Sequence, residues 1–421
     1  MKNNAINFKK YMLSSICEFN QDNISNTDSF NNINYLDTGN ITENNINTIV
    51  TYNIKNAPSR AKRKVKDKTI IYSTVRPIQK HYGILHNPAS NLIVSTGFIT
   101  INIKKEYINI IDEYYLYYLI TQNFITDYLQ IIAEGSVSAY PSITYDNIAC
   151  LKFDFPNFNY QRIIAQCILN IDKKIQVNNQ INSELEQMAK TLYNYWFIQF
   201  DFPDENGRPY KSSGGKMVWN EELKKEIPEC WEVENLANNS ISSIIPVGIE
   251  YFNKKNYLET KNINNELISD GAWISYDNRE NRANMQPELN SIWFAKMQKS
   301  IKHITLPSNS QWFIDKYILS TGFFGLKCSK DALSYIHCFI NSKYFENKKN
   351  TLAHGATQKA VNNQDLERIP LIIPPTNLLK AFNSKIYNLL EMKLNIIKTN
   401  QELTSLRDFL LPLLMNGQAL I

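Results

Sequence analysis

The sequence predicts a mixed α+β fold, in which two globular α/β domains are joined by two long antiparallel coiled-coil helices as a pseudo-twofold tandem repeat. Three observations predict this architecture. Short motifs recur at a spacing of about half of the 421 residues. Each copy ends in a long run of apolar residues at helical spacing, and shorter strand-like and helix-like runs are mixed upstream of that helix.

Four motif pairs recur in the same order, at spacings of 220 to 225 residues. They are Tyr35-Leu-Asp-Thr-x-Asn-Ile41 with Tyr257-Leu-Glu-Thr-x-Asn-Ile263, Ser95-Thr-Gly-Phe98 with Ser320-Thr-Gly-Phe323, Gly135-Ser136 with Gly355-Ala356, and Asn179-Gln180 with Asn400-Gln401. One order at nearly one spacing indicates a tandem duplication, and the small drift indicates short loop insertions.

The two long helices are expected where apolar residues alternate in steps of four and three, which is typical of a coiled coil. The first seam is Ile164, Ile168, Ile171, Ile175, Asn178, Asn182, Leu185, Ala189, Leu192 and Trp196, and the second is Leu378, Phe382, Lys385, Leu389, Met392, Ile396, Thr399, Leu403, Leu406, Leu410 and Leu413. A spacing of 221 superposes the seams and puts Asn178 over Thr399. Asn157 or Asn159 and Thr376 or Asn377 are the expected N-caps. The alternative is that each helix packs only on its own globular core.

These elements divide the chain into five segments. Strand-like runs include 69–75, 92–103 and 369–373, and helix-like runs include 113–132 and 330–341. Residues 201–216, rich in Pro, Gly and Ser, read as an exposed turn or linker. The expected segments are a first globular domain at 1–157, a long helix at 158–199, a linker at 200–230, a second globular domain at 231–376 and a second long helix at 377–417.

Composition points to a protein of the reduced cytoplasm. No apolar run is long enough to span a membrane, no secretion signal is apparent, and the six cysteines show no CxxC pair. The net charge of +5 permits nucleic-acid binding without requiring it. Six basic residues fall within positions 60–68, which indicates either a DNA-binding loop or an ordinary solvated basic loop.

The sequence carries no catalytic constellation. It lacks the phosphate-binding motifs GxxxxGK[ST] and GxGxxG, the amino-methyltransferase motif [DN]PP[YF], the GxSxG of serine hydrolases and the HExxH of metalloproteases. A nuclease-like match, Pro203-Asp204 followed by Glu222-Leu223-Lys224, lies in the linker, where nothing would hold a metal between rigid strands. We therefore expect no catalytic residue and no metal site, and interpret the chain as a binding or scaffolding subunit.

The chain resembles the specificity subunit of type I restriction-modification enzymes over essentially its whole length. The resemblance is carried by Leu185–Phe202 and its continuation through Asn206-Gly207, Lys216-Met217 and Ile227–Trp231, by Ser320–Phe324 and Gly355–Lys359 with Ile369-Pro-Leu, and by Leu403–Gly417. Two features depart from the family pattern. The first copy has Phe8 and Leu13 where the second has Trp231 and Leu236, and its glycine loop, 135–140, lacks the Gly-x-Thr-Gln form.

The resemblance implies that each globular domain is a target recognition domain that reads one half of a bipartite, asymmetric DNA site. It implies that the helices dock two methyltransferase subunits, which bind S-adenosylmethionine and methylate adenine, and that a helicase-nuclease subunit joins the complex. This chain would hold no cofactor and would act in the bacterial cytoplasm, at the nucleoid when bound to DNA. The alternatives are a coiled-coil scaffold that does not read DNA and a fragment of a self-sufficient methyltransferase, which the missing motifs argue against.

Candidate contact residues follow from these roles, because basic and hydroxyl side chains bind phosphates while Arg, Lys, Gln and Asn read base edges. The DNA-facing candidates are Arg60, Arg63, Lys64, Arg76, Ser136, Ser138 and Tyr140 in the first domain, and Arg279, Arg282, Lys299, Lys302, Thr357, Gln358 and Lys359 in the second. The partner-binding candidates are Ile163, Ile181, Met188, Trp196, Ile386, Ile397, Leu406 and Leu413. The motif at 95–98 and its repeat are expected to serve as core and turn.

Overall fold

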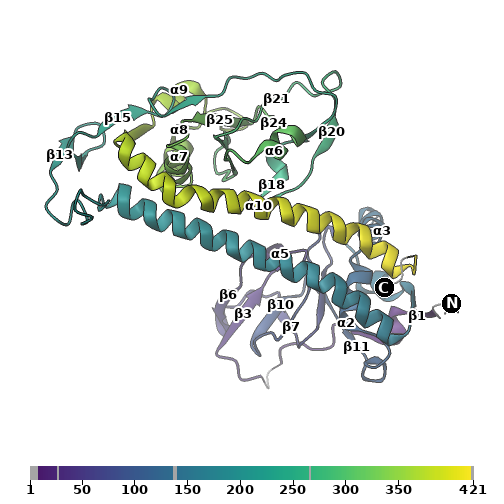
Figure 1. Ribbon diagram of the computed structural model, residues 1–421. Helices are drawn as coiled ribbons and strands as arrows, with labels where there is room; N and C mark the ends of the chain where they lie inside the picture. Colours follow the sequence, from purple (N-terminus) through teal and green to yellow (C-terminus); the bar gives the residue numbers. More distant parts are fainter. Residues whose placement is uncertain (1–7, 26–27, 136–139, 265–266, 419–421) are drawn as a thin grey trace. The chain divides into compact units, whose positions relative to one another are not determined.

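The computed structural model describes residues 8–25, 28–135, 140–264 and 267–418. The chain forms two compact units (Figure 1). The first unit comprises Met1–Lys174 together with Thr404–Ile421, and the second comprises Ile175–Leu403. Each long helix begins in one unit and ends in the other, so each unit contains one globular domain and a stretch of both helices.

The globular part of the first unit is built on two four-stranded sheets. Their strand orders are β6-β3-β10-β7 and β2-β11-β8-β9. The bounds are β2 Cys17–Phe19, β3 Asn32–Leu36, β6 Val50–Asn53, β7 Ala61–Lys64, β8 Ile70–Ser73, β9 Tyr82–Ile84, β10 Leu92–Ser95 and β11 Phe98–Ile103. Strands β3 and β10 run parallel, and every other neighbouring pair is antiparallel. The β-branched and aromatic residues of β8, β10 and β11 suit strands that are buried on both faces.

Helices and short ribbons complete this unit. The helices are α1 Leu13–Ile16, α2 Glu113–Ile120, α3 Asn123–Glu134 and α4 Tyr145–Ala149, and the ribbons are β1 Lys9–Met12 with β12 Lys152–Phe155 and β4 Ile41–Thr42 with β5 Asn45–Ile46. The helix-like run at 113–132 is divided at Thr121, whose hydroxyl donates to the Tyr117 carbonyl at 2.8 Å. The main core lies between the second sheet, these helices and the start of the first long helix.

The second unit repeats this topology strand for strand. Its sheets have the orders β20-β17-β24-β21 and β16-β25-β22-β23, and β17 and β24 are again the parallel pair. The bounds are β16 Ser242–Ile244, β17 Lys255–Leu258, β20 Ala272–Ile274, β21 Ala283–Met285, β22 Ser291–Ala295, β23 His303–Leu306, β24 Tyr317–Ser320 and β25 Phe323–Cys328. The accompanying elements are β15 Glu232–Asn235 with β26 Pro370–Ile373, β18 Ile263–Asn264 with β19 Leu267–Ile268, α7 Leu333–Ile340, α8 Lys343–Leu352, α9 Asn363–Glu367 and the extra helix α6 Gln311–Lys316. The tandem repeat inferred from the motifs is thus present as a repeated fold.

The long helices are α5, Phe158–Tyr193, and α10, Thr376–Met415. The Asn157 side chain accepts from Tyr160 N–H at 3.0 Å and caps the start of α5, as one of the two expected residues. The cap expected at Thr376 or Asn377 is wrong, because α10 already begins at Thr376 and the Asn377 side chain accepts only from the adjacent Leu378 N–H, at 2.9 Å. A π-helical turn, Asn194–Ile198, continues α5.

The two helices pair antiparallel. In the second unit, Asn178 bonds to Asn400 at 2.7 Å and the rings of Trp196 and Phe382 lie 5.6 Å apart, so partner numbers fall along α10 as they rise along α5. The helices also contact each other in the first unit, where Asp172 and Arg407 are 3.1 Å apart.

The seam predicted for the first helix is confirmed, since its ten positions are all buried or half-buried. The seam predicted for the second helix is confirmed at seven of its eleven positions, which are buried or half-buried, and is wrong at the other four. Lys385, Met392, Thr399 and Leu406 are exposed, and the buried positions lie about one residue later: Leu379, Ile386, Leu390 and Asn400. The physical reason is that α10 packs on the globular core as well as on α5, which widens and turns its apolar face. Asn178 therefore faces Asn400, not Thr399.

The segment expected to be an exposed linker is folded against the second unit. Strands β13, Met217–Asn220, and β14, Lys225–Pro228, form a hairpin. Upstream, the buried Phe202 ring stacks on Tyr210 at 4.7 Å and on Trp231 at 5.2 Å. Sequence composition indicated the turns correctly but could not reveal that three stacked aromatic residues anchor them.

Candidate nucleic-acid interface and subunit-docking helices

The turn between β10 and β11 has the same construction as its repeat between β24 and β25. Gly97 N–H donates to the buried Ser95 hydroxyl at 3.2 Å, and Gly322 N–H donates to the buried Ser320 hydroxyl at 3.2 Å. A Cβ added at Gly97 would lie 2.9 Å from the Thr38 methyl carbon, and one added at Gly322 would lie 3.2 Å from the equivalent threonine methyl. The two repeated motifs of each domain therefore pack together, and the close approach requires glycine.

Each turn also binds the residue that precedes a neighbouring strand. Thr96 N–H donates to the Arg60 carbonyl at 2.8 Å, and Thr321 N–H donates to the Arg282 carbonyl at 2.8 Å. Arg60 immediately precedes β7 and Arg282 immediately precedes β21. The alanine that follows each arginine is buried, whereas both arginines are exposed, as the alternation of a strand requires. The two arginines thus occupy equivalent positions.

A loop between two strands continues this arrangement in each domain. Thr74 N–H donates to the Gly97 carbonyl at 2.8 Å, and Lys296 N–H donates to the Gly322 carbonyl at 2.9 Å. The loop that follows α3 in the first domain, and the loop that follows α8 in the second, are attached in the same way. Ile143 N–H donates to the Thr74 carbonyl at 2.8 Å. In the second domain, Val361 N–H donates to the Lys296 carbonyl at 3.1 Å.

A further backbone bond fixes the tips of these loops. Arg76 N–H donates to the Pro141 carbonyl at 2.9 Å, and Gln298 N–H donates to the Lys359 carbonyl at 2.9 Å. We call this set of turn, arginine and two loops the turn frame. The turn frame defines equivalent positions in the two domains. Arg60 is equivalent to Arg282, Thr74 to Lys296, Arg76 to Gln298, Tyr140 to Gln358 and Pro141 to Lys359.

The turn frame brings together three of the candidates in the first domain. Arg60 and Arg76 are exposed, and the Arg76 guanidinium lies 5.5 Å from the ring of Tyr140, which is 62% exposed. Two other candidates have internal roles. The Lys64 ammonium is paired with Asp28 at 3.1 Å, and burial lowers the pKa of Arg63, whose Nε is buried. Ser136 and Ser138 lie outside the described residues.

The second domain presents more of its candidates to solvent. Arg282, Lys299, Thr357, Gln358 and Lys359 are exposed. The last three belong to a tight loop that Gly355 opens at a φ of +134°, where an added Cβ would meet the Gln358 carbonyl oxygen at 2.6 Å.

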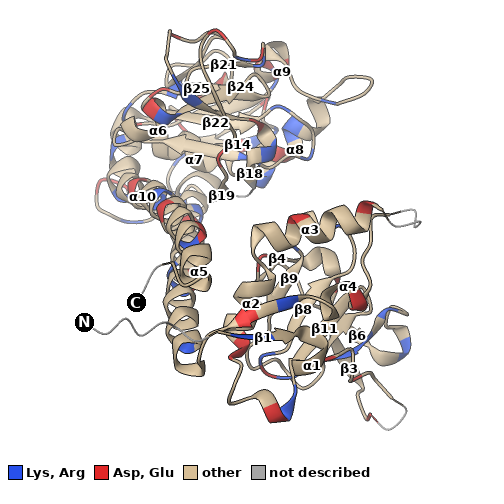
Figure 2. Ribbon diagram, turned by 90° about the vertical axis from the view of Figure 1, so that its right-hand side faces the viewer, with Lys and Arg blue, Asp and Glu red and all other residues tan. Residues whose placement is uncertain are grey.

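Two candidates of the second domain are already engaged. Arg279 donates to the Tyr276 carbonyl, and its guanidinium lies 3.9 Å from the centre of the Tyr276 ring. Lys302 donates to the Thr260 carbonyl, and burial lowers its pKa. Basic and acidic residues are interspersed in both units (Figure 2), so net charge alone does not mark a DNA-binding face.

Sequence reasoning missed two members of the turn frame in the second domain, as it missed Thr74 and Pro141 in the first. Lys296 lies 4.2 Å from the centre of the Phe324 ring, and burial lowers its pKa. Gln298 donates to the Asn350 carbonyl at 2.7 Å. Neither stands in a repeated motif, because the corresponding first-domain residues are Thr74 and Arg76. Only the backbone pairing reveals their equivalence.

The partner-binding candidates fall into two groups. Ile163, Met188 and Leu406 are exposed, and Ile181, Ile397 and Leu413 are half-buried. Trp196 and Ile386 are buried in the chain's own core, so they are no part of the surface of the isolated chain. One apolar residue that the sequence reading missed is Phe409, which is 65% exposed. It stands 221 residues after Met188, the spacing that also relates Asn179 to Asn400, and Met188 is 58% exposed.

Buried charges join the helices within each unit. In the second unit, Glu186 contacts both Lys393 and His337, the latter at 3.3 Å. Burial acts to raise the pKa of Glu186, but the two basic neighbours outweigh burial and hold this pKa well below its usual range. In the first unit the acidic residue is again on α5 and the basic one on α10, because Asp172 faces Arg407. The neighbouring carboxylates raise the pKa of Arg407 despite burial.

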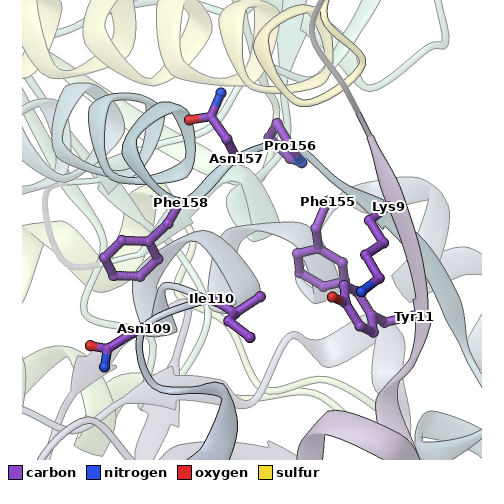
Figure 3. A pocket seen from close by; sticks show the side chains of 8 residues that line it. All are labelled: Lys9, Tyr11, Asn109, Ile110, Phe155, Pro156, Asn157 and Phe158. Atoms are coloured by element: carbon purple, nitrogen blue, oxygen red, sulfur yellow. The ribbon is translucent and has the colours of Figure 1, made fainter.

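A hollow of about 240 Å³ lies in the first unit at the start of α5 (Figure 3). Its lining is mainly aromatic, aliphatic and amide, and its charged member is Lys9, beside Tyr11. This lining contains no acid-base pair or nucleophile. Among the described residues no group of His, Cys, Asp and Glu is placed to hold a metal ion. Within the same residues, no helix is long and apolar enough to cross a membrane.

Comparison with known proteins identifies relatives along the whole chain. A family model described as the type I restriction modification DNA specificity domain matches residues 6–187. The chain is 24% identical to the specificity subunit of the type I restriction enzyme HindI from Haemophilus influenzae, over 98% of this chain and 99% of that protein. It is 25% identical to the MjaIX specificity subunit from Methanocaldococcus jannaschii, over 86% of this chain and 82% of that protein.

A solved structure shares the fold. The S subunit of a type I restriction-modification system from M. genitalium aligns with a TM-score of 0.54 at 14% identity, over 98% of this chain and 97% of that one. The curated relatives are named as specificity subunits. Over residues 6–187 by the family model, and over nearly its whole length by its relatives, this chain is similar to the specificity subunits of type I restriction-modification enzymes.

Proposed function

We propose that the two globular domains of this chain each read one half of a bipartite, asymmetric site on double-stranded DNA. The observation that carries the proposal is the turn frame, which both domains build with the same backbone hydrogen bonds but fill with different side chains. A shared frame with divergent contacts suits two domains that approach DNA in the same way and recognise different sequences.

In the proposed complex, the long helices dock two adenine methyltransferase subunits. Met188 and Phe409 support this part of the proposal, because large apolar side chains at equivalent places on the two helix copies offer one partner two similar sites. S-adenosylmethionine would be bound by the methyltransferase, and a helicase-nuclease subunit would join the same assembly. The chain itself would contribute recognition and no cofactor, and it would act at the bacterial nucleoid.

Two measurements test the proposal. Duplex DNA binding by the chain together with its methyltransferase should weaken steeply as salt rises, because bound phosphates release counterions. Sequencing of methylated adenines in cells that carry both subunits should give a motif with two different halves and a spacer. A complex that assembles but neither binds duplex DNA nor methylates a bipartite motif would favour the coiled-coil scaffold instead.

A further inference from the structure

We propose that Arg60 and Arg282 make one and the same contact twice, each binding a DNA backbone phosphate in its own half-site, while the loop residues beside them read bases. This inference rests on the proposed function and assigns separate roles to the positions of the turn frame. Its ligand is the phosphodiester group, which is chemically identical in every sequence.

The two arginines share their surroundings as well as their position. Tyr35 lies beside Arg60 and Ser95, and Tyr257 lies beside Arg282 and Ser320. Burial raises the pKa of each tyrosine, and the adjacent arginine and serine oppose that rise in both domains.

An acidic residue completes each group. The Tyr35 hydroxyl donates to Asp37 at 3.1 Å, and Glu259 replaces Asp37 in the second domain. These groups come from the repeated tyrosine and serine motifs, so the duplicated motifs serve to position one arginine per domain.

Both guanidinium groups are free to take an anion. In the part of the chain that the structure describes, neither Arg60 nor Arg282 forms an ion pair, and both are exposed. The neighbouring cations differ in this respect, since Lys64 is paired with Asp28 and Arg279 lies on the ring of Tyr276. An unpaired guanidinium held at a strand start is well suited to a phosphate, which it can bind through two parallel hydrogen bonds.

The other positions of the frame diverge. At the loop tip, Arg76 of the first domain is replaced by Gln298 in the second. In the adjoining loop, Tyr140 is replaced by Gln358. A phosphate contact can be kept when a domain acquires a new sequence, whereas a base contact must change, because each base pair presents its own pattern of donors and acceptors. The arginine is the same in both domains while its neighbours differ, as expected if the arginine binds phosphate and the neighbours read bases.

The test uses the full chain in complex with its methyltransferase. We would compare Arg60→Gln and Arg282→Gln with Arg60→Lys and Arg282→Lys, and use Arg208→Gln, in the folded segment between the domains, as the matched control. Each Gln variant should reduce the slope of log affinity against log salt by about one unit, since one phosphate contact is lost. Each Lys variant should keep the slope, because an ammonium also binds phosphate, and no variant should alter the methylated motif.

Other results overturn the inference. A changed base in either half of the motif would show that the arginine reads sequence, because a phosphate contact carries no base identity. An unchanged salt slope in the Gln variants would show that the arginine does not touch DNA. If the wild-type complex itself binds no duplex DNA, it is the proposed function that fails.

Discussion

At the residue scale, Asn400 joins the two long helices through both ends of its side chain. Its amide oxygen accepts from Asn178 at 2.7 Å, its amide nitrogen donates to Asn179 at 2.8 Å, and the residue is 5% exposed. Asn400→Ala removes both bonds and leaves a buried amide group without its partner, so we expect the free energy of unfolding to fall by about 2 kcal/mol. Urea unfolding measures the change.

The matched control is Asn395→Ala, which alters an exposed asparagine of the same helix. It should change the free energy of unfolding by less than about 0.5 kcal/mol. Equal effects of the two substitutions would mean that the asparagine bonds between the helices contribute nothing to stability.

Glu186 gives the helix pair of the second unit a dependence on pH. Because its pKa is lower in the folded chain than in the unfolded one, the ion pairs add stability above the unfolded carboxyl pKa of about 4.3, and this stability is lost as the pH falls towards the folded pKa. Glu186→Gln leaves Lys393 and His337 without their carboxylate and should cost about 3 kcal/mol at pH 7.

Unfolding in urea at several pH values tests this expectation. The difference in the free energy of unfolding between wild type and Glu186→Gln should become smaller as the pH falls below about 4. Glu184→Gln, at an exposed position of the same helix, should show no such difference. A difference that stays constant down to pH 3 would contradict the assignment of the stabilising charge to Glu186.

Residue types predicted the DNA-facing candidates only in part. Arg60, Arg76 and Tyr140 lie in the turn frame of the first domain, and Arg282, Gln358 and Lys359 lie in that of the second, so their contact with DNA stays a prediction. The basic cluster at 60–68 was less informative, because whether a lysine is free depends on distant neighbours such as Asp28, which pairs with Lys64. Periodicity and composition carry no information about such pairs.

At the element scale, the seam of α5 was predictable throughout, whereas that of α10 was predictable only in part. A period of 3.5 identifies an apolar face, but it cannot say how many partners that face has. Leu379, Ile386 and Leu390 belong to the core of the second unit as well as to the helix pair, so the buried line on α10 is displaced from the ideal seam.

The helix surfaces lead to a prediction about stoichiometry. We expect Met188→Asp to remove one methyltransferase copy from the complex and Phe409→Asp to remove the other, because a carboxylate would be buried at an apolar contact. Native mass measurement of the purified assembly at saturating methyltransferase reports the number of copies.

The control for this prediction is Gln176→Asp, which introduces the same charge at an exposed position about three turns from Met188. It should leave two copies bound. Retention of both copies by the double variant Met188→Asp with Phe409→Asp would place the docking surface elsewhere, and a single copy on the wild-type chain would refute the docking of two.

At the scale of the whole molecule, the duplication predicts modular specificity. Replacing residues 231–376 with the second domain of another family member should change one half of the methylated motif and leave the other half unaltered. The donor must supply equivalents of Trp231, Tyr335 and Phe339, because these pack with both long helices in one core. Sequencing methylated DNA from cells with the chimera measures the outcome.

The reciprocal exchange of residues 1–157 serves as the control and should change only the opposite half. A change in both halves after either exchange would show that the domains do not read independently. Assembly of each chimera with the methyltransferase should be checked by mass, since a loss of methylation without assembly reports on packing.

The duplication could be read from motif spacing, but the sheets could not. Each first sheet places a parallel pair, β3 with β10 or β17 with β24, at its centre. The paired strands are separated by many residues and by other strands, so local pattern has no means of selecting the partner. The fold class was therefore predictable, whereas strand order needed the structure.

The division of the chain has a consequence for its biosynthesis. The first unit includes Thr404–Ile421, and Leu414 and Met415 are buried with the core formed by residues of the first domain. A ribosome completes the second unit before it has made the residues that close the first. The N-terminal domain must therefore wait through the translation of more than two hundred residues with part of its core uncovered. A nascent chain arrested before Thr404 would expose the apolar surface of the first unit, although all of the second unit has already been synthesised.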